Sequence, residues 1–180
     1  SIISCISISA AEINPQAVTE LLHRIGGAGA ADRFVTIVDE SLSKDGKDIF
    51  IITAQGHRPC IKGNSVLAVT TGINWYLNHY AHINLAWNRP KADLGSAKLP
   101  LPTTEETRTC TADYRYYLNY CTFSYSMSVW TWERWQQEID WMALHGINMP
   151  LQIVGLDVVW MKLLTQYYGY SPDEANKFIA

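Results

Sequence analysis

Apolar and polar positions in the first part of the chain recur with the periods of helices and strands. An apolar stripe at helical spacing follows Asn14 and Pro15, which predicts a helix that Asn14 caps and that Gly26-Gly27 ends. Apolar side chains alternate with polar ones at residues 34–38, which predicts a strand. This part of the chain is therefore predicted to mix helices and strands.

Four further segments complete the pattern of the first half. They are strands at 49–53, 57–61 and 82–87, and a helix at 64–80 that Asn64 or Ser65 caps. We expect 57–61 to be an edge strand, because Pro59 has no backbone N–H to donate. The order helix, three strands, helix, strand predicts a small α+β domain at residues 1–88, with helices packed on a sheet.

Periodicity is lost at residues 89–112, where three prolines and a Thr- and Glu-rich stretch predict a linker between domains. The pattern resumes at residues 113–180. It predicts an aromatic-rich strand at 115–121, a helix capped by Thr131 and ended by Gly146, and an apolar strand at 147–154. Strand, helix and strand with short connections form a βαβ unit, whose strands are parallel.

Three helices are predicted in this second part. The helix after Thr131 carries an apolar stripe that we expect to face the core, made of Trp132, Trp135, Ile139 and Met142. Residues 156–168 also have helical spacing. The last helix begins after Ser171, where Pro172 takes the first position and Glu174 completes a capping box.

Composition and charge exclude several classes of protein. The 180 residues are 48% hydrophobic and 17% charged, which is enough apolar material for a core. The net charge is -3 and no basic run exists, so we expect no nucleic-acid partner. No apolar stretch approaches the roughly 20 residues that a membrane span needs. The five histidines show no ligand spacing, so the sequence predicts no metal site.

The first eleven residues have three open interpretations. Residues 1–11 resemble the end of a secretory signal peptide, which predicts a secreted or periplasmic protein. Residues 2–5 loosely resemble a bacterial lipoprotein cleavage box, which predicts a lipid anchor at the cell surface. A β-strand is the third interpretation. The four cysteines show no redox or metal spacing, and their disulfide pairing stays open.

Aromatic side chains are concentrated in residues 114–135, with small polar groups between them. Aromatic faces alternating with short hydrogen-bonding groups suit a pyranose sugar, which has an apolar face and hydroxyl groups at its edges. The alternative is that most of these rings belong to the core, because aromatic side chains bury large areas.

One long block of the sequence resembles a known family. It begins with Arg115, Tyr116, Tyr117, Asn119, Cys121, Thr122, Ser124, Tyr125 and Ser126, continues through a Trp-rich segment, and ends with Glu138, Ile139, Asp140, Trp141, Met142, Ala143, Leu144, Gly146, Ile147 and Asn148. These residues are similar, in order, to the start of the catalytic barrel of α-N-acetylglucosaminidases, glycoside hydrolase family 89. The upstream part resembles the small domain that precedes the barrel in that family.

The resemblance implies an exo-acting hydrolase that removes terminal α-linked N-acetylglucosamine from glycans with retention of configuration, without a cofactor. It implies that residues 113–180 begin a (β/α)8 barrel, and about 250 residues are typical of the whole barrel. We therefore expect this segment to need the rest of the barrel, or another chain, for stability. The family's catalytic glutamates belong to later strands, so no catalytic residue is assigned within residues 1–180.

Four residues are predicted to contact the sugar. Asn119 and Cys121 lie two apart near the end of the predicted strand 115–121, so their side chains should point to one side, and the resemblance implies that they contact sugar hydroxyls. Tyr125 and Gln152 are second candidates. The alternative is a core role, with the Asn and Gln amides bonded internally and a buried thiol.

The acids of this segment are expected to play other roles. Glu133, Glu138 and Asp140 lie on the helix after the first strand, whereas barrel chemistry lies at the carboxyl ends of strands, so we expect structural or solvent-facing positions. Asp157 follows the second strand, but the family usually has Gln-Glu where this chain has Leu156-Asp157. A favourable acid in the first turn of a helix is the alternative for Asp157.

A second function, from another class, fits the same residues. A non-catalytic carbohydrate-binding or scaffold module would also present aromatic rings and small polar groups to a sugar. Binding of N-acetylglucosamine without turnover would distinguish such a module from part of an enzyme.

Overall fold

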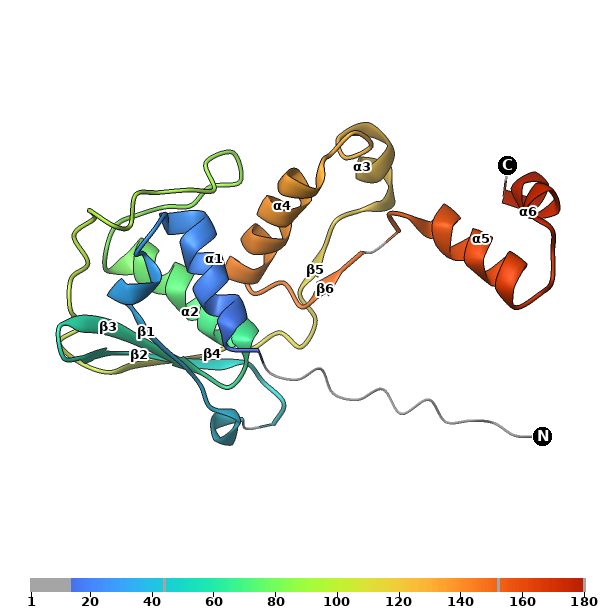
Figure 1. The fold of residues 1–180 in the computed structure, drawn as a ribbon. Helices are drawn as coiled ribbons and strands as arrows, with labels where there is room; N and C mark the ends of the chain where they lie inside the picture. Colours follow the sequence, from blue (N-terminus) through green and yellow to red (C-terminus); the bar gives the residue numbers. More distant parts are fainter. Residues whose placement is uncertain (1–13, 44, 152, 180) are drawn as a thin grey trace. The chain divides into compact units, whose positions relative to one another are not determined.

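A computed structural model describes residues 14–179 apart from residues 44 and 152. The proposed signal-peptide remnant at residues 1–11 and the candidate Gln152 therefore lie outside the described residues. The helices and strands follow the order shown in Figure 1. They are α1 (Gln16–Gly26), β1 (Val35–Val38), β2 (Ile49–Gln55), β3 (Arg58–Gly63), α2 (Val66–His79), β4 (Glu106–Thr109), β5 (Tyr116–Tyr117), α3 (Tyr120–Tyr125), α4 (Trp132–Leu144), β6 (Met149–Pro150), α5 (Leu156–Gln166) and α6 (Pro172–Ile179). Two short 3-10 helices, Ala31–Arg33 and Glu40–Leu42, flank β1.

The described chain divides into two compact units, and each is considered by itself. The first unit comprises residues up to Tyr116 together with Thr131–Met149. The second comprises Tyr117–Trp130 and the residues from Pro150 onward. The helix α4 therefore belongs to the same unit as the sheet of the N-terminal half.

A four-stranded mixed sheet forms the base of the first unit, in the order β1-β3-β2-β4. The strands β1 and β3 are parallel, whereas β2 is antiparallel to both β3 and β4. Figure 1 shows α1 and α2 on one side of this sheet. The predicted α+β layer architecture is confirmed.

Local signals in the sequence set the helix boundaries well. The helix α1 begins within one residue of its prediction, and Asn14 Oδ1 accepts a bond from the backbone N–H of Gln16 at 3.0 Å. Ser65 caps α2 by accepting from the N–H of Ala68 at 3.0 Å. At α6, Ser171 and Glu174 exchange the reciprocal bonds of a capping box.

Two strand predictions in the first unit are wrong. Strand β3 lies inside the sheet rather than at its edge, because its pairing with β1 begins only at Cys60 and so leaves the missing N–H of Pro59 outside that ladder. Residues 82–87 form no strand; the β-pairing of this described segment is limited to an isolated bridge between Ala86 and Arg89. The fourth strand is β4, which lies within residues 89–112, after the three prolines of that segment.

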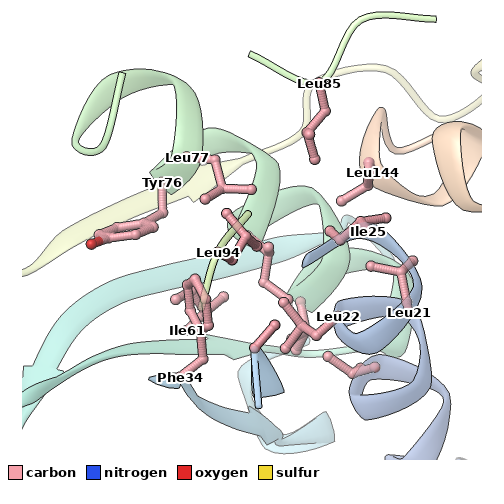
Figure 2. Close-up of a cluster of buried hydrophobic side chains, with 14 of the residues drawn as sticks. Leu21, Leu22, Ile25, Phe34, Ile61, Tyr76, Leu77, Leu85, Leu94 and Leu144 are labelled. Atoms are coloured by element: carbon pink, nitrogen blue, oxygen red, sulfur yellow. The ribbon is translucent and has the colours of Figure 1, made fainter. Parts of the chain in front are cut away.

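The core of the first unit joins α1, α2, the sheet and α4. Figure 2 shows buried side chains from these elements in one cluster, including Leu22, Ile61, Tyr76 and Leu144. Leu94 also belongs to this cluster, and the backbone N–H of Leu94 donates to the carbonyl of Gly26 at 3.1 Å. Gly72 allows α2 to approach the sheet, because a Cβ there would lie 2.7 Å from Ile61 Cγ2.

The predicted βαβ unit is present, with shorter strands than expected. The N–H groups of Met149 and Leu151 donate to the carbonyls of Arg115 and Tyr117, so the bonds advance in the same direction along β5 and β6, as parallel strands require. Helix α4 lies between them and ends at Leu144, just before Gly146, whose φ is 69°. The strands predicted at 115–121 and 147–154 are each only two residues long.

The buried face of α4 differs from the predicted apolar stripe. Trp132 is 65% exposed and Ile139 is 46% exposed, whereas Glu138, Asp140, Met142 and Leu144 are buried. The stripe prediction is therefore wrong for two of its four members. Two acids lie on the packed side because they accept hydrogen bonds there: Asp140 from Arg24 of α1, and Glu138 from the indole N–H of Trp87 and from Arg134 of α4 itself.

The second unit contains α3 and the helical pair α5 and α6. Phe123 and Met127 are buried around α3. Helix α6 packs against α5, with Leu164 and Ala175 buried. Among the described residues, no helix combines the length and the apolar character needed to cross a membrane.

Candidate functional site

Arg115 fixes the start of the segment that carries the candidate sugar contacts. Its guanidinium is mostly buried, pairs with Asp48 and donates to the carbonyls of Ala112 and Gly146. Its backbone N–H donates to Asn148 Oδ1 at 2.8 Å. The first residue of the family-like block therefore anchors β5 to the N-terminal sheet domain and to the entry of β6, rather than facing solvent as a ligand contact.

Asn119 takes a different backbone position from the one that the sequence predicts. The strand ends at Tyr117, and Leu118 turns the chain with a φ of 76°. Asn119 is then the N-cap of α3, and its Oδ1 accepts from the N–H groups of Cys121 at 2.9 Å and Thr122 at 3.3 Å. Asn119 and Cys121 therefore do not share one side of a strand, and that prediction is wrong. The aromatic pattern predicted a strand here, but Asn119 caps a helix instead.

The structure still brings three candidates together on one small element. Asn119 caps α3, and Cys121 and Tyr125 lie four residues apart on it, so they are neighbours on one helical face. The Oδ1 atom of Asn119 is used by the cap, while its Nδ2 group makes no hydrogen bond to any described residue. Cys121 is an exposed free thiol, and Tyr125 is 82% exposed.

This arrangement has the chemistry of a sugar contact. The Asn119 amide has two N–H donors for hydroxyl oxygens, and an exposed Tyr125 provides a ring face and a hydroxyl. The exposed Tyr120 adds a second ring from the same helix. Gln152 lies outside the described residues, so its part in this candidate site stays a prediction.

Two of the acids on α4 hold the first unit together. Glu138 is fully buried, and its Oε2 accepts from Trp87 Nε1 at 2.8 Å and from Arg134 Nη2 at 2.9 Å. Asp140 accepts two bonds of 2.7 Å from Arg24, which lies 116 residues earlier in the chain. The structural roles predicted for these two acids are confirmed, although nothing in the sequence pattern identified Arg24 as the partner.

The remaining acids are exposed and serve helix ends. Glu133 lies in the first turn of α4, where hydrogen bonding to the Thr131 hydroxyl lowers the pKa of its carboxyl. Asp157 is exposed in the first turn of α5, where the helix dipole favours an acid. In the part of the chain that the structure describes, no three His, Cys, Asp or Glu side chains come together in a way that could hold a metal ion.

Two family models match this chain. One describes the alpha-N-acetylglucosaminidase (NAGLU) N-terminal domain and matches residues 16–103. The other describes the alpha-N-acetylglucosaminidase (NAGLU) tim-barrel domain and matches residues 115–180. The fold class expected from the sequence, a small α+β domain followed by the start of a barrel, is confirmed.

Individual relatives agree with the family models. Human alpha-N-acetylglucosaminidase is 35% identical over 164 residues, which are 90% of this chain and 22% of the human protein. The family 89 glycoside hydrolase of Clostridium perfringens, solved with its substrate GlcNAc-alpha-1,4-galactose, superposes with a TM-score of 0.71 at 28% identity over 89% of this chain and 18% of the bacterial one. The same enzyme in complex with PUGNAc gives a TM-score of 0.70.

This chain therefore spans about a fifth of the length of the relatives that it matches. The matches run through both predicted parts of the sequence, and the resemblance carried by Arg115 to Asn148 is confirmed. The chain belongs to the α-N-acetylglucosaminidases of glycoside hydrolase family 89.

Proposed function

We propose that this chain is the N-terminal part of an exo-acting, retaining glycoside hydrolase that removes terminal α-linked N-acetylglucosamine. The proposal is carried by sequence and structural similarity over about nine-tenths of this chain. The similar proteins are human alpha-N-acetylglucosaminidase and a bacterial enzyme solved with a GlcNAc-containing substrate. Residues 1–88 would form the supporting domain, 89–112 the linker, which also contributes β4 to the sheet of that domain, and 113–180 the beginning of the barrel.

The contribution of this chain to the reaction is recognition of the sugar. Asn119, Cys121, Tyr125 and Gln152 are the proposed contacts. The free Nδ2 group of Asn119 donates to a hydroxyl or to the acetamido carbonyl, and Tyr125 lies along the ring. The capping bonds hold the Asn119 side chain in one orientation before the sugar arrives, which lowers the entropic cost of binding.

The catalytic pair is proposed to come from other residues of the enzyme. Retaining hydrolysis needs two carboxyl groups about 5–5.5 Å apart, one as nucleophile and one as acid/base. The buried acids Glu138 and Asp140 already accept bonds from Trp87, Arg134 and Arg24. A buried carboxylate whose oxygens are held in this way has no access to a glycosidic bond.

The protein that contains this chain, purified as its source produces it, provides the test. Its action on an aryl α-N-acetylglucosaminide, followed by proton NMR, should release the α anomer first, and Asn119→Ala should raise KM. Asn74→Ala, an amide removal on α2, is the matched control and should leave KM unchanged. First release of the β anomer would contradict retention, and absence of turnover would contradict the proposed activity.

A carbohydrate-binding module is the second candidate, favoured by the exposure of Tyr120 and Tyr125. It predicts that the same protein binds N-acetylglucosamine in calorimetry without hydrolysing any α-linked substrate. Secretion or a periplasmic location also remains part of the proposal and is based on the apolar residues 1–11.

A further inference from the structure

A cavity of about 150 Å³ lies within the first unit, whereas the residues proposed to contact the sugar belong to the second unit. It is lined by the end of α1, by parts of residues 85–91 and by one face of α4. The lining positions on α4 recur at spacings of three and four from 133 to 144, so a single rigid helix presents them. We call this cavity the α1–α4 pocket.

The inner part of the α1–α4 pocket is apolar. Ile25, Leu85 and Leu144 are buried there, and Figure 2 shows their side chains close to one another. Trp141 adds an indole ring that stacks on His145 with ring centroids 4.0 Å apart, which holds the indole in place. An aromatic ring beside aliphatic side chains suits the apolar face of a ring-shaped ligand.

The polar part of the pocket has unused hydrogen-bonding groups. Gln136, Gln137 and Lys91 line the cavity, and none of the three bonds to another described residue. Each glutamine amide both donates and accepts, which matches a hydroxyl group that also does both. Two such amides on consecutive residues can bond to neighbouring hydroxyl groups of one ligand.

The charges around the pocket balance, which decides the class of ligand. Arg24 and Asp140 neutralise each other through two bonds of 2.7 Å, and the pKa of Arg24 is raised by that hydrogen bonding. Lys91 and Glu133 are the other two charged residues of the lining, and they have opposite signs. The pocket therefore offers hydrogen bonds without a net charge that would select an anion or a cation.

We propose that the α1–α4 pocket binds one neutral pyranose ring, with the ring face on the apolar floor and hydroxyl groups on Gln136 and Gln137. A cavity of about 150 Å³ in another protein holds benzene, so the α1–α4 pocket has room for the six-membered ring itself, with the hydroxyl substituents directed toward Gln136 and Gln137. The proposal does not rest on the hydrolase function.

The test is a titration of the whole protein that contains this chain with N-acetylglucosamine and with methyl α-D-glucoside, followed by nitrogen–proton NMR. The indole N–H signal of Trp141 and the side-chain amide signals of Gln136 and Gln137 should move and saturate in the millimolar range. Gln136→Ala and Gln137→Ala should each weaken binding at the Trp141 signal about five-fold, the size expected for one neutral hydrogen bond. Gln55→Ala, on the exposed end of β2, is the matched control and should change nothing.

Three outcomes would overturn the proposal. The first is no saturable movement of the three signals with either sugar. The second is equal binding in the Gln136, Gln137 and Gln55 variants. The third is saturation by sulfate in place of sugar, which would identify a charged ligand at Lys91.

If an alanine variant unfolds, Gln137→Glu replaces it, because it keeps the side-chain length and removes the amide donors. Asn119→Ala should leave the pocket signals unchanged, so this result is independent of the proposed sugar contacts on α3.

Discussion

The Arg24–Asp140 pair joins α1 to α4, and its removal gives the sharpest test of the packing. The guanidinium donates through Nε and Nη2 to both carboxylate oxygens at 2.7 Å. The two partners differ in burial, because the Arg24 side chain is 31% exposed and the Asp140 side chain is 8% exposed. We therefore expect removal of the cation and removal of the anion to have different costs.

The magnitude follows from what each variant leaves behind. Breaking a buried pair by removing one partner costs about 3–5 kcal/mol, whereas exposed pairs contribute about 0–1 kcal/mol. Arg24→Met leaves a buried carboxylate without a cation, so we expect a loss of about 2–4 kcal/mol, discounted for the solvent that reaches the site. Asp140→Asn leaves a guanidinium that water can reach and keeps one acceptor, so we expect about 1–2 kcal/mol.

Urea unfolding followed by circular dichroism gives the free energies, provided that the slope with denaturant stays constant among variants. Glu20→Gln is the matched control, because Glu20 is an exposed acid 3.9 Å from the same arginine, and we expect a change below about 0.5 kcal/mol. If Asp140→Asn costs no more than Glu20→Gln, the pair adds nothing to stability. If Asp140→Asn costs more than Arg24→Met, the burial argument is wrong.

Three other predictions concern packing, pH and reactivity. Gly72→Ala should destabilise the first unit by about 1–3 kcal/mol in the same assay, because its Cβ would lie 2.7 Å from a methyl group of Ile61, and an unchanged stability would show that the sheet and α2 can separate at no cost. Burial raises the pKa of Tyr76 to about 12 from its ordinary value of about 10. The neutral phenol therefore contributes its full stability below pH 10, and this stability is lost as the pH rises through 12. In thermal melts, the melting temperature of Tyr76→Phe should fall less over this pH range than that of the parent chain. Iodoacetamide followed by mass spectrometry should label the exposed Cys121 quickly and the buried Cys60, whose pKa burial raises, only on unfolding; equal rates would contradict the burial of Cys60.

Local chemistry explains which parts of the fold could be predicted from the sequence. Helix starts at Ser65 and Ser171 and the stop at Gly146 depend on side chains and dihedral angles within one turn, and the structure has them where they were expected. The family resemblance was also readable, because it depends on the identity and order of residues. These signals do not require knowledge of any distant partner.

Strands were harder to predict because their extent depends on pairing. Residues 147–154 have the composition of a buried strand, but only Met149–Pro150 is assigned to a strand in the described chain. The edge prediction for residues 57–61 used the missing N–H of Pro59 and could not include the register, in which β1 begins pairing one residue later. Register joins segments far apart in the chain, and a single sequence carries little information about it.

The candidate site shows the same division between local and distant information. The residue types of Asn119 and Cys121 suggested a polar contact for a sugar, whereas their placement on a strand was wrong because Asn119 satisfies the N–H groups at the start of α3. A capping residue followed by a helix was a readable alternative, since Asn is among the strongest N-caps. The aromatic pattern of residues 114–120 is typical of a strand, and the prediction followed that pattern instead of the N-cap.

Helix α4 shows why an apolar stripe can misidentify the packed face. Its sequence carries tryptophans on one side and acids on another, and hydrophobicity alone places the tryptophans inside. In the structure Trp132 is largely exposed while Glu138 and Asp140 are buried, because the facing elements offer hydrogen-bond donors: Trp87 to Glu138 and Arg24 to Asp140. A buried carboxylate is tolerated only when such donors are present, so the packed face of α4 was determined by residues about 50 and 116 positions earlier in the chain. The packed face of α4 is in this sense specified by the N-terminal domain as much as by the helix's own sequence.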